Sequence, residues 1–152
     1  MSEKAICLIG YQDIPADKQN YVRQELKQEV QIALDLGYRR FLAEYTTGLG
    51  TLFIQCVNEY REQYQDIFLE VVLYNPEQSR FTDKEQELLS KCNCIRPLLG
   101  DYKQDYPLAV TRYLAGTSGR VIVVHAKQIN HDTAYALDYA LTMGRSLRII
   151  QT

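Results

Sequence analysis

The chain has 152 residues, 46% of them hydrophobic, and a formal net charge of −2. This length favours a single globular domain over residues 1–152, burying roughly 70% of the surface of the unfolded chain, and excludes two ordinary domains. The 17 basic residues are spread along the chain, no segment approaches the ~20 apolar residues of a membrane span, and the N-terminal apolar run is too short for a signal peptide. We therefore expect a soluble cytoplasmic protein whose partners are neither nucleic acids nor membranes.

Apolar runs alternate with helical patterns from the start of the chain. Residues 4–10 form an apolar run typical of a buried strand. Residues 22–34 carry apolar side chains at helical spacing, and Gly37 ends that predicted helix. A second strand is predicted at residues 39–44, and an amphipathic helix follows with its apolar stripe over residues 53–64.

The alternation continues to the end of the chain. Strands are expected at residues 67–73, 92–95 (a short edge strand), 120–125 and 147–150, and helices at residues 82–90, 107–115 and 132–143. Strands that read as continuous apolar runs belong to a parallel sheet that is covered on both faces. The predicted fold class is therefore α/β, an open, doubly wound, mainly parallel sheet with helices on both faces, in a three-layer, Rossmann-like arrangement.

The loop between the second strand and the second helix contains Gly48 and Gly50. Glycine permits a positive φ and a close approach of a ligand to the backbone, and the helix start offers N–H groups to an anion. If Gly50 has a positive φ, Gly50→Ala should cost more than ~1 kcal/mol of stability. The alternative is a tight turn only, because Phe53 stands where the G-x-G-x-x-G fingerprint has its third glycine.

In open parallel sheets, ligands bind outside the carboxyl ends of the strands, near the point where the strand order reverses. Four loops should converge there, at residues 10–12, 46–51, 73–76 and 126–133. We expect an anion against the backbone N–H groups of residues 47–52. The expected ligand-binding residues are Gly10, Tyr11, Thr46, Thr47, Gly48, Leu49, Gly50, Thr51, Asn130, Asp132 and Thr133.

Several polar side chains at strand ends have two interpretations each. Glu44 is the best-placed carboxylate for a ribose hydroxyl or for general base work, and otherwise a solvated charge at a strand end. Asp132 and Thr133 either hydrogen-bond a ribose or phosphate, or cap the helix behind them. Tyr11, Tyr45 and Tyr74 are candidates for stacking on a base or sugar.

The cysteines and histidines predict no further site. Cys92 and Cys94 form a C-x-C pair expected to point to one side of a strand, but no second pair has metal-ligand spacing. His125 and His131 have no serine or cysteine placed to pair with them. We expect no metal and no cofactor, and Glu44 remains the one candidate catalytic residue.

Three motifs carry a resemblance to a known family. An Ile-Gly-Tyr turn after the first strand, a loop of the (S/T)-G-x-x-G type after the second, and a late A-x-x-x-G-R-x-L-x-I-I pattern resemble the SLOG superfamily, above all its YpsA-like branch. The superfamily comprises Rossmann-like proteins related to LOG and to the Rossmann domain of DprA. The resemblance covers nearly the whole chain in order of elements, and it implies a nucleotide-site scaffold.

The motifs match the family only in part. Gly10 and Tyr11 stand in the family's first loop, and Leu49 and Gly50 at the end of its glycine loop. The two acids that the family commonly carries beyond that loop are replaced by Leu52 and Val57. The family's late glycine pair before threonine is replaced by His131 and Asp132, and the P-G-G-x-G-T-x-x-E signature of LOG-type phosphoribohydrolases has no counterpart.

The missing acids favour binding over catalysis. We expect a module that binds a nucleotide or nucleotide-derived metabolite without turnover. One alternative is a nucleotide-processing enzyme, an N-glycosidase of the phosphoribohydrolase kind, with Glu44 and Asp132 as its available acids. Another is an interaction scaffold that has lost its pocket. The identity of the ligand and the oligomeric state are left open, with a homodimer as one alternative.

Overall fold

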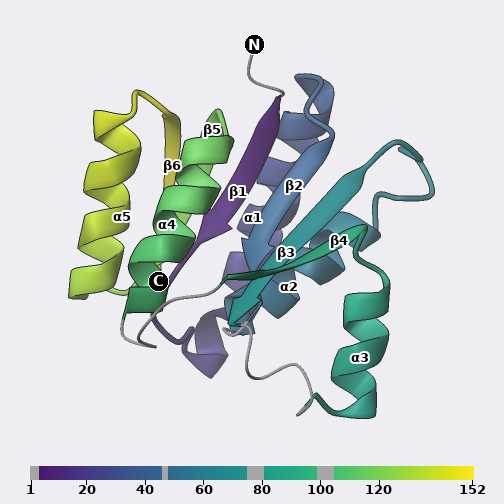
Figure 1. Cartoon of the computed structure of the whole chain (residues 1–152), viewed down its shortest axis with the longest axis horizontal. Coiled ribbons are helices and arrows are strands. Elements are labelled where there is room, and N and C mark those ends of the chain that lie inside the picture. Colours follow the sequence, from purple (N-terminus) through teal and green to yellow (C-terminus); the bar gives the residue numbers. More distant parts are fainter. Residues whose placement is uncertain (1–3, 46–47, 75–80, 99–104) are drawn as a thin grey trace.

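Six parallel strands form one sheet in the order β4-β3-β2-β1-β5-β6 among the residues that the computed structural model describes, which are 4–45, 48–74, 81–98 and 105–152 (Figure 1). The strands are β1 (Ala5–Ile9), β2 (Arg40–Glu44), β3 (Phe68–Tyr74), β4 (Cys94–Leu98), β5 (Arg120–His125) and β6 (Ser146–Gln151). The helices are η1 (Ala16–Lys18, a 3-10 turn), α1 (Gln19–Asp35), α2 (Gly48–Asn58), α3 (Asp83–Ser90), α4 (Tyr106–Thr117) and α5 (His131–Thr142). The predicted fold class is confirmed.

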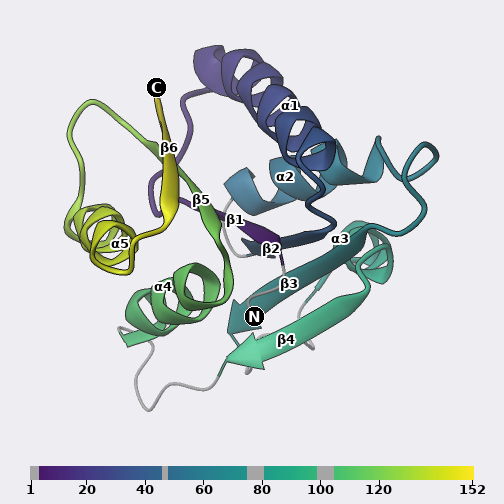
Figure 2. The ribbon, with the colours of Figure 1, turned by 90° about the horizontal axis from the view of Figure 1, so that it is seen from above.

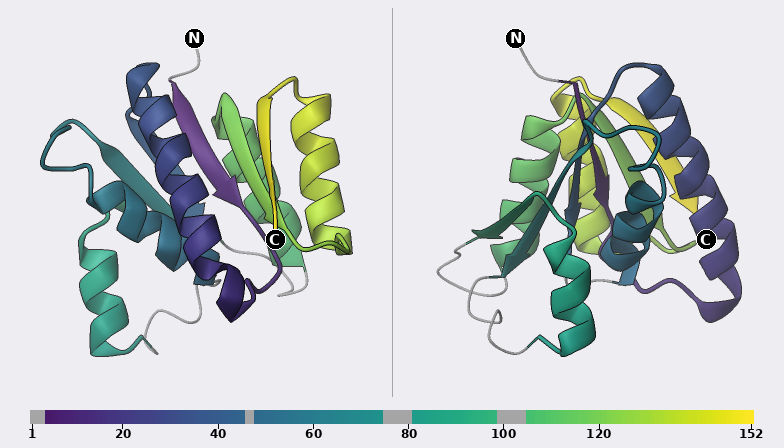
Figure 3. Two further views of the ribbon diagram at one scale, coloured as in Figure 1. Left: turned by 180° about the vertical axis from the view of Figure 1, so that it is seen from behind. Right: turned by 90° about the vertical axis from the view of Figure 1, so that its right-hand side faces the viewer.

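The order in which the chain adds strands to the sheet reverses at β1. The chain steps from β1 outward to β4, then returns through α4 to β5 on the other side of β1. Because crossovers between parallel strands are right-handed, the helices of the two runs lie on opposite faces. Figures 2 and 3 show α1 and α2 on one face and α4 and α5 on the other. The switch point that binds ligands in such folds is therefore between β1 and β5.

Each face of the sheet has its own hydrophobic core. Ile6 and Phe41 belong to the core beneath α1 and α2, whereas their neighbours Cys7 and Leu42 belong to the core beneath α4. The alternation follows from the two-residue period of a strand, and the parallel register aligns it across the sheet. Both faces are apolar over the central strands, which explains the continuous apolar runs in the sequence.

Local signals end or begin several helices. Gly37, at φ +92, follows the end of α1 in a conformation that side chains with a Cβ avoid. Thr82 and Glu85 form a reciprocal capping box at the start of α3. No helix in the described part of the chain is long and apolar enough to cross a membrane.

The edge strand differs from its prediction. It begins at Cys94 and not at Cys92, because the Asn93 side chain and backbone both bond to Leu69, at 2.8 Å each, before the ladder starts. Cys92 packs against the core beneath α1 and α2, while Cys94 lines a cavity on the α4 face, so the expectation that the pair shares one side is wrong. Pro97 fits here, because an edge strand tolerates a missing N–H.

Candidate functional site

The carboxyl end of β1 is packed closely against its neighbours. A Cβ on Gly10 would lie 2.4 Å from Leu49 Cδ2 and 3.1 Å from the Val124 carbonyl oxygen. A larger residue at position 10 would therefore push α2 away from the junction of β1 and β5. This packing holds the start of α2 beside the switch point of the sheet.

A cavity of about 490 Å³ opens at this edge, between the loop after β1 and the first turns of α1 and α2. The helix behind it has 11 residues, long enough for its N-terminus to carry a useful partial positive charge. A Cβ on Gly48 would meet no atom within 4 Å, so the backbone there is open to a ligand. The lining residues are Gln12, Asp13, Ile14, Gln19, Arg23, Gly48, Leu49, Thr51, Leu52 and Gln55.

Arg23 supplies a cation opposite the start of α2. Its Nη2 donates to Gln55 Oε1 over 3.4 Å, a long bond that a stronger acceptor would replace. Lys27, one turn further along α1, is already paired with Glu59 at 3.0 Å. Sequence reasoning missed Arg23, because it enters the cavity through the packing of α1 on α2. Its position beside Val22, on the edge of the apolar stripe, was the one available signal.

The loops after β1 and β5 are joined by side-chain hydrogen bonds. Gln12 Nε2 donates to the Gln128 carbonyl oxygen at 2.8 Å, and Gln12 Oε1 accepts from the Ala126 N–H at 3.4 Å. Asn130 Nδ2 donates to the Tyr11 carbonyl oxygen at 3.1 Å. The convergence expected from topology is therefore present for these two loops.

Asn130 also starts α5. Its Oδ1 accepts from the Thr133 N–H at 2.9 Å, so the helix cap is Asn130, and the expectation that Asp132 and Thr133 form the cap is wrong. The cause is that the helix begins one residue earlier than predicted, at His131. Thr133 is fully buried, and neither it nor Asp132 lines the cavity.

Glu44 lies on the other face of the sheet from the cavity. Its side chain is buried against α4, where Oε1 accepts from the Tyr106 hydroxyl at 2.9 Å. The interpretation as a solvated strand-end charge is therefore wrong, because α4 covers this end of β2. Burial raises the pKa of Tyr106, and the negative charge of Glu44 raises it further.

Two of the three tyrosines expected to stack on a ligand, Tyr11 and Tyr45, pack within the protein instead, and the side chain of Tyr74 lies outside the described part of the chain. The Tyr11 hydroxyl lies 2.7 Å from Thr111 Oγ1 and donates to the Pro107 carbonyl oxygen at 3.0 Å, which anchors the ring to α4. Tyr45 is buried edge-on to Phe81, with 5.4 Å between the ring centroids. Neither ring lines the cavity at the start of α2.

Gly50 is required for a different reason from the one expected. Among the described glycines, a positive φ occurs at Gly37 and Gly144, and not at Gly50. A Cβ on Gly50 would instead lie 1.8 Å from the Glu44 carbonyl oxygen. The helix crosses the end of β2 so closely that only glycine fits.

The predicted ligand-binding residues divide into separate groups. Gly48, Leu49 and Thr51 line the cavity, and Gly10 and Gly50 permit the close packing behind it. Tyr11, Asn130, Asp132 and Thr133 do not line it, and Thr46 and Thr47 lie outside the described residues. Within the described ranges, no group of three or more His, Cys, Asp or Glu side chains could hold a metal ion.

Comparisons with known proteins add little. No family model and no curated protein matches the chain. Among solved structures, the chain is similar to a dipeptide epimerase from Methylococcus capsulatus complexed with a magnesium ion, with 15% identity and a TM-score of 0.39. The match covers 99% of this chain and 48% of the epimerase, so the chain spans about half the length of that protein. A TM-score this low carries no functional information.

Proposed function

We propose that the protein binds a nucleotide or nucleotide-derived metabolite in the cavity at the start of α2, without turning it over. The observation that carries the proposal is the open helix N-terminus at Gly48 facing a cavity that also contains Arg23. Backbone N–H groups and a guanidinium together suit a phosphate group. The resemblance to SLOG proteins supports the same ligand class.

The acids near the cavity favour binding without hydrolysis. Asp13 is the one carboxylate in the described lining, and it is exposed on the loop after β1. Glu44, the candidate base, faces α4 and bonds to Tyr106 on the other side of the sheet. Leu52 lines the cavity where the resembling proteins commonly carry an acid. Cleavage of an N-glycosidic bond needs a carboxylate held at the ribose, and among the described lining residues the exposed Asp13 is the one available.

The test compares adenosine, AMP, ADP-ribose and NAD as probes in thermal-shift and calorimetric titrations, with product formation followed by chromatography. A ligand at one hundred times its Kd should add ~2.7 kcal/mol of stability and raise Tm by several degrees. We expect at least one phosphorylated probe to bind, adenosine to bind more weakly, and no probe to be hydrolysed.

Variants separate this site from others. Arg23→Gln should raise the Kd of the phosphorylated probe by about tenfold or more and leave the Kd of adenosine unchanged, because the lost contact is to phosphate. Gly48→Glu should abolish binding through repulsion, while the matched variant Gly48→Ala should retain it. Absence of binding by all four probes would contradict the proposal and favour an interaction scaffold. Turnover that disappears in Glu44→Gln would instead establish an enzyme.

A further inference from the structure

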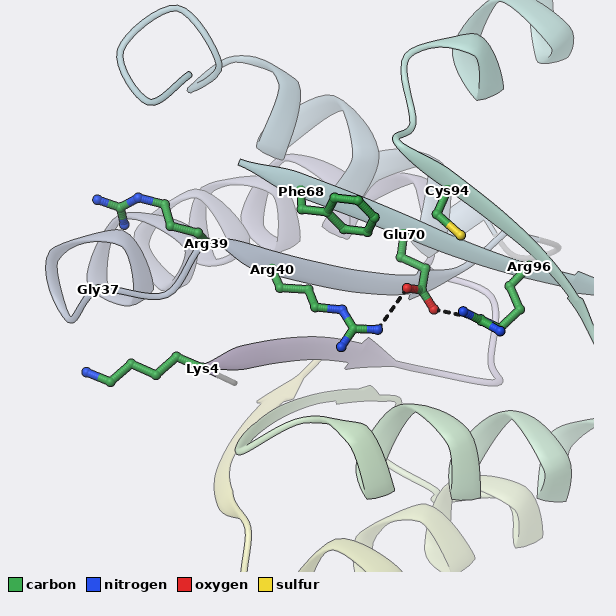
Figure 4. A pocket seen from close by; sticks show the side chains of 8 residues that line it. All are labelled: Lys4, Gly37, Arg39, Arg40, Phe68, Glu70, Cys94 and Arg96. Carbon is green, nitrogen blue, oxygen red and sulfur yellow. Dashed lines mark hydrogen bonds and ion pairs between the residues drawn. The ribbon is translucent and has the colours of Figure 1, made fainter. Parts of the chain in front are cut away.

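A second and larger cavity lies at the amino ends of the strands, opposite the carboxyl ends that border the first cavity. On the α4 face, the amino ends of β2, β3 and β4 border a cavity of about 710 Å³ (Figure 4). Such a volume suits a small molecule. No described residue lines both this cavity and the one at the start of α2. The lining residues are Lys4, Gly37, Arg39, Arg40, Phe68, Glu70, Cys94 and Arg96.

The floor of this cavity holds a buried carboxylate. The side chain of Glu70 is 2% exposed, and its Oε1 accepts from Arg40 Nη2 at 2.9 Å. Its Oε2 accepts from Arg96 Nε at 3.0 Å and from the Tyr113 hydroxyl. Burial alone would raise the pKa of Glu70, but the three donors outweigh it and hold the pKa below its ordinary value. Glu70 is therefore an ionised carboxylate that pairs with two guanidinium groups at once.

Stability alone does not account for this arrangement. Buried ion pairs are often replaceable by apolar side chains at no cost, because desolvation offsets the attraction. Two neighbouring positions on the same face, Leu42 on β2 and Val72 on β3, are apolar and fully buried. What Glu70 does achieve is orientation, since Arg40 and Arg96 approach it from the strands on either side (Figure 4).

The remaining lining adds positive charge and one apolar surface. The described lining contains four basic residues and one acidic residue. Lys4 and Arg39 point away from Glu70 (Figure 4), and Arg39 pairs with Asp66 at 3.0 Å. Arg40 and Arg96 are therefore the lining cations that contact Glu70. Phe68, with 40% of its surface exposed, presents its ring beside them.

We propose that this cavity is a second binding site, for a small aromatic molecule that bears a carboxylate or phosphate group. The anionic group binds the guanidinium groups of Arg40 and Arg96, because planar guanidinium groups bind both anions in bidentate fashion. The aromatic ring packs against Phe68, which shields apolar surface that is otherwise in water. The site is independent of the nucleotide cavity and does not require it.

The test titrates the whole protein with phenyl phosphate, benzoate and the neutral benzyl alcohol, followed by amide chemical shifts and calorimetry. We expect the two anions to shift the amides of Arg40, Glu70 and Arg96 saturably, and benzyl alcohol to leave them in place. The ratio of the two anion affinities distinguishes a phosphate ligand from a carboxylate ligand. Shifts confined to the start of α2 would overturn the proposal, and so would equal binding of benzyl alcohol.

Variants test the assignment to these residues. Arg96→Gln should raise Kd by about tenfold or more, and Arg96→Lys should recover only part of the loss because it keeps the charge but not the bidentate fork. Phe68→Ala should raise Kd by about threefold or more. Arg112→Gln, on the exposed side of α4, is the matched control and should change nothing. An unchanged Kd in Arg96→Gln would refute the proposal. It would also be refuted if the same amides shifted with protein concentration in the absence of a probe, because a second copy of the chain would then cover this face.

Discussion

The substitution Gly50→Ala tests the closest packing in the candidate site. The new Cβ would lie 1.8 Å from the Glu44 carbonyl oxygen, 2.9 Å from its carbonyl carbon and 3.3 Å from Tyr45 Cα. All three atoms belong to the backbone of the chain leaving β2, so no side chain can rotate out of the way. Real Cβ atoms essentially never lie closer than 3.0 Å to such an atom. To restore that distance between the new Cβ and the Glu44 carbonyl oxygen, α2 and the end of β2 must separate by more than 1 Å.

The expected loss of stability follows from two opposing effects. Overpacking of a well-filled site costs ~1–3 kcal/mol, and a backbone clash belongs at the upper end. Alanine gains ~1 kcal/mol over glycine inside a helix, which offsets part of the cost. The net loss is about 2 kcal/mol, which for a domain of this size lowers Tm by ~4–8 °C.

Urea unfolding followed by far-UV circular dichroism and tyrosine fluorescence measures the loss, since the chain has no tryptophan. The matched control is Gly48→Ala, two residues earlier in the same helix, where a Cβ meets no atom within 4 Å. This control should be neutral or stabilising by up to ~1 kcal/mol. Equal stability of Gly50→Ala and the unmodified protein would refute the close approach, and an equal loss in both variants would show that the helix start, and not the crossing, is sensitive.

Three further predictions concern Thr133, Asn130 and Cys7. Thr133→Val should stabilise the protein by ~1 kcal/mol in thermal melts, because the buried Thr133 hydroxyl has no hydrogen-bond partner among the described residues, and a loss of stability would show that it has one. Asn130→Ala should cost ~1 kcal/mol or more through the lost helix cap and the lost bond to Tyr11, whereas Asp132→Ala should cost less in the same melts; equal losses would contradict the assignment of the cap. Burial raises the pKa of the Cys7 thiol from 9.0 to about 12. Because the thiol of the unfolded chain loses its proton first, the contribution of the buried thiol to stability is complete below pH 9 and is lost as pH rises toward 12. Urea unfolding should show this decline, with a smaller slope in Cys7→Ala, and an equal slope in both proteins would contradict it.

The sequence by itself determined the order and type of the elements. The short apolar runs, the helical spacing of apolar residues and the helix stop at Gly37 are local signals, and each predicted an element that the structure contains. Continuous apolar runs predicted the parallel sheet, and the rule for such sheets predicted that the loops after β1 and β5 converge. Those inferences succeeded because they depend on neighbours in the chain or on topology alone.

Only the tertiary structure decided which side chains share a site. Glu44 ends an apolar strand and was one candidate for the ligand crevice, yet the side-chain alternation of β2 turns it toward α4 and Tyr106. Arg23 enters the cavity through the packing of α1 on α2, and Gly50 is dictated by a crossing between two elements. Arg40, Glu70 and Arg96 come from three different strands, and the strand register alone brings them together. No local period records such relations, because they depend on residues tens of positions apart.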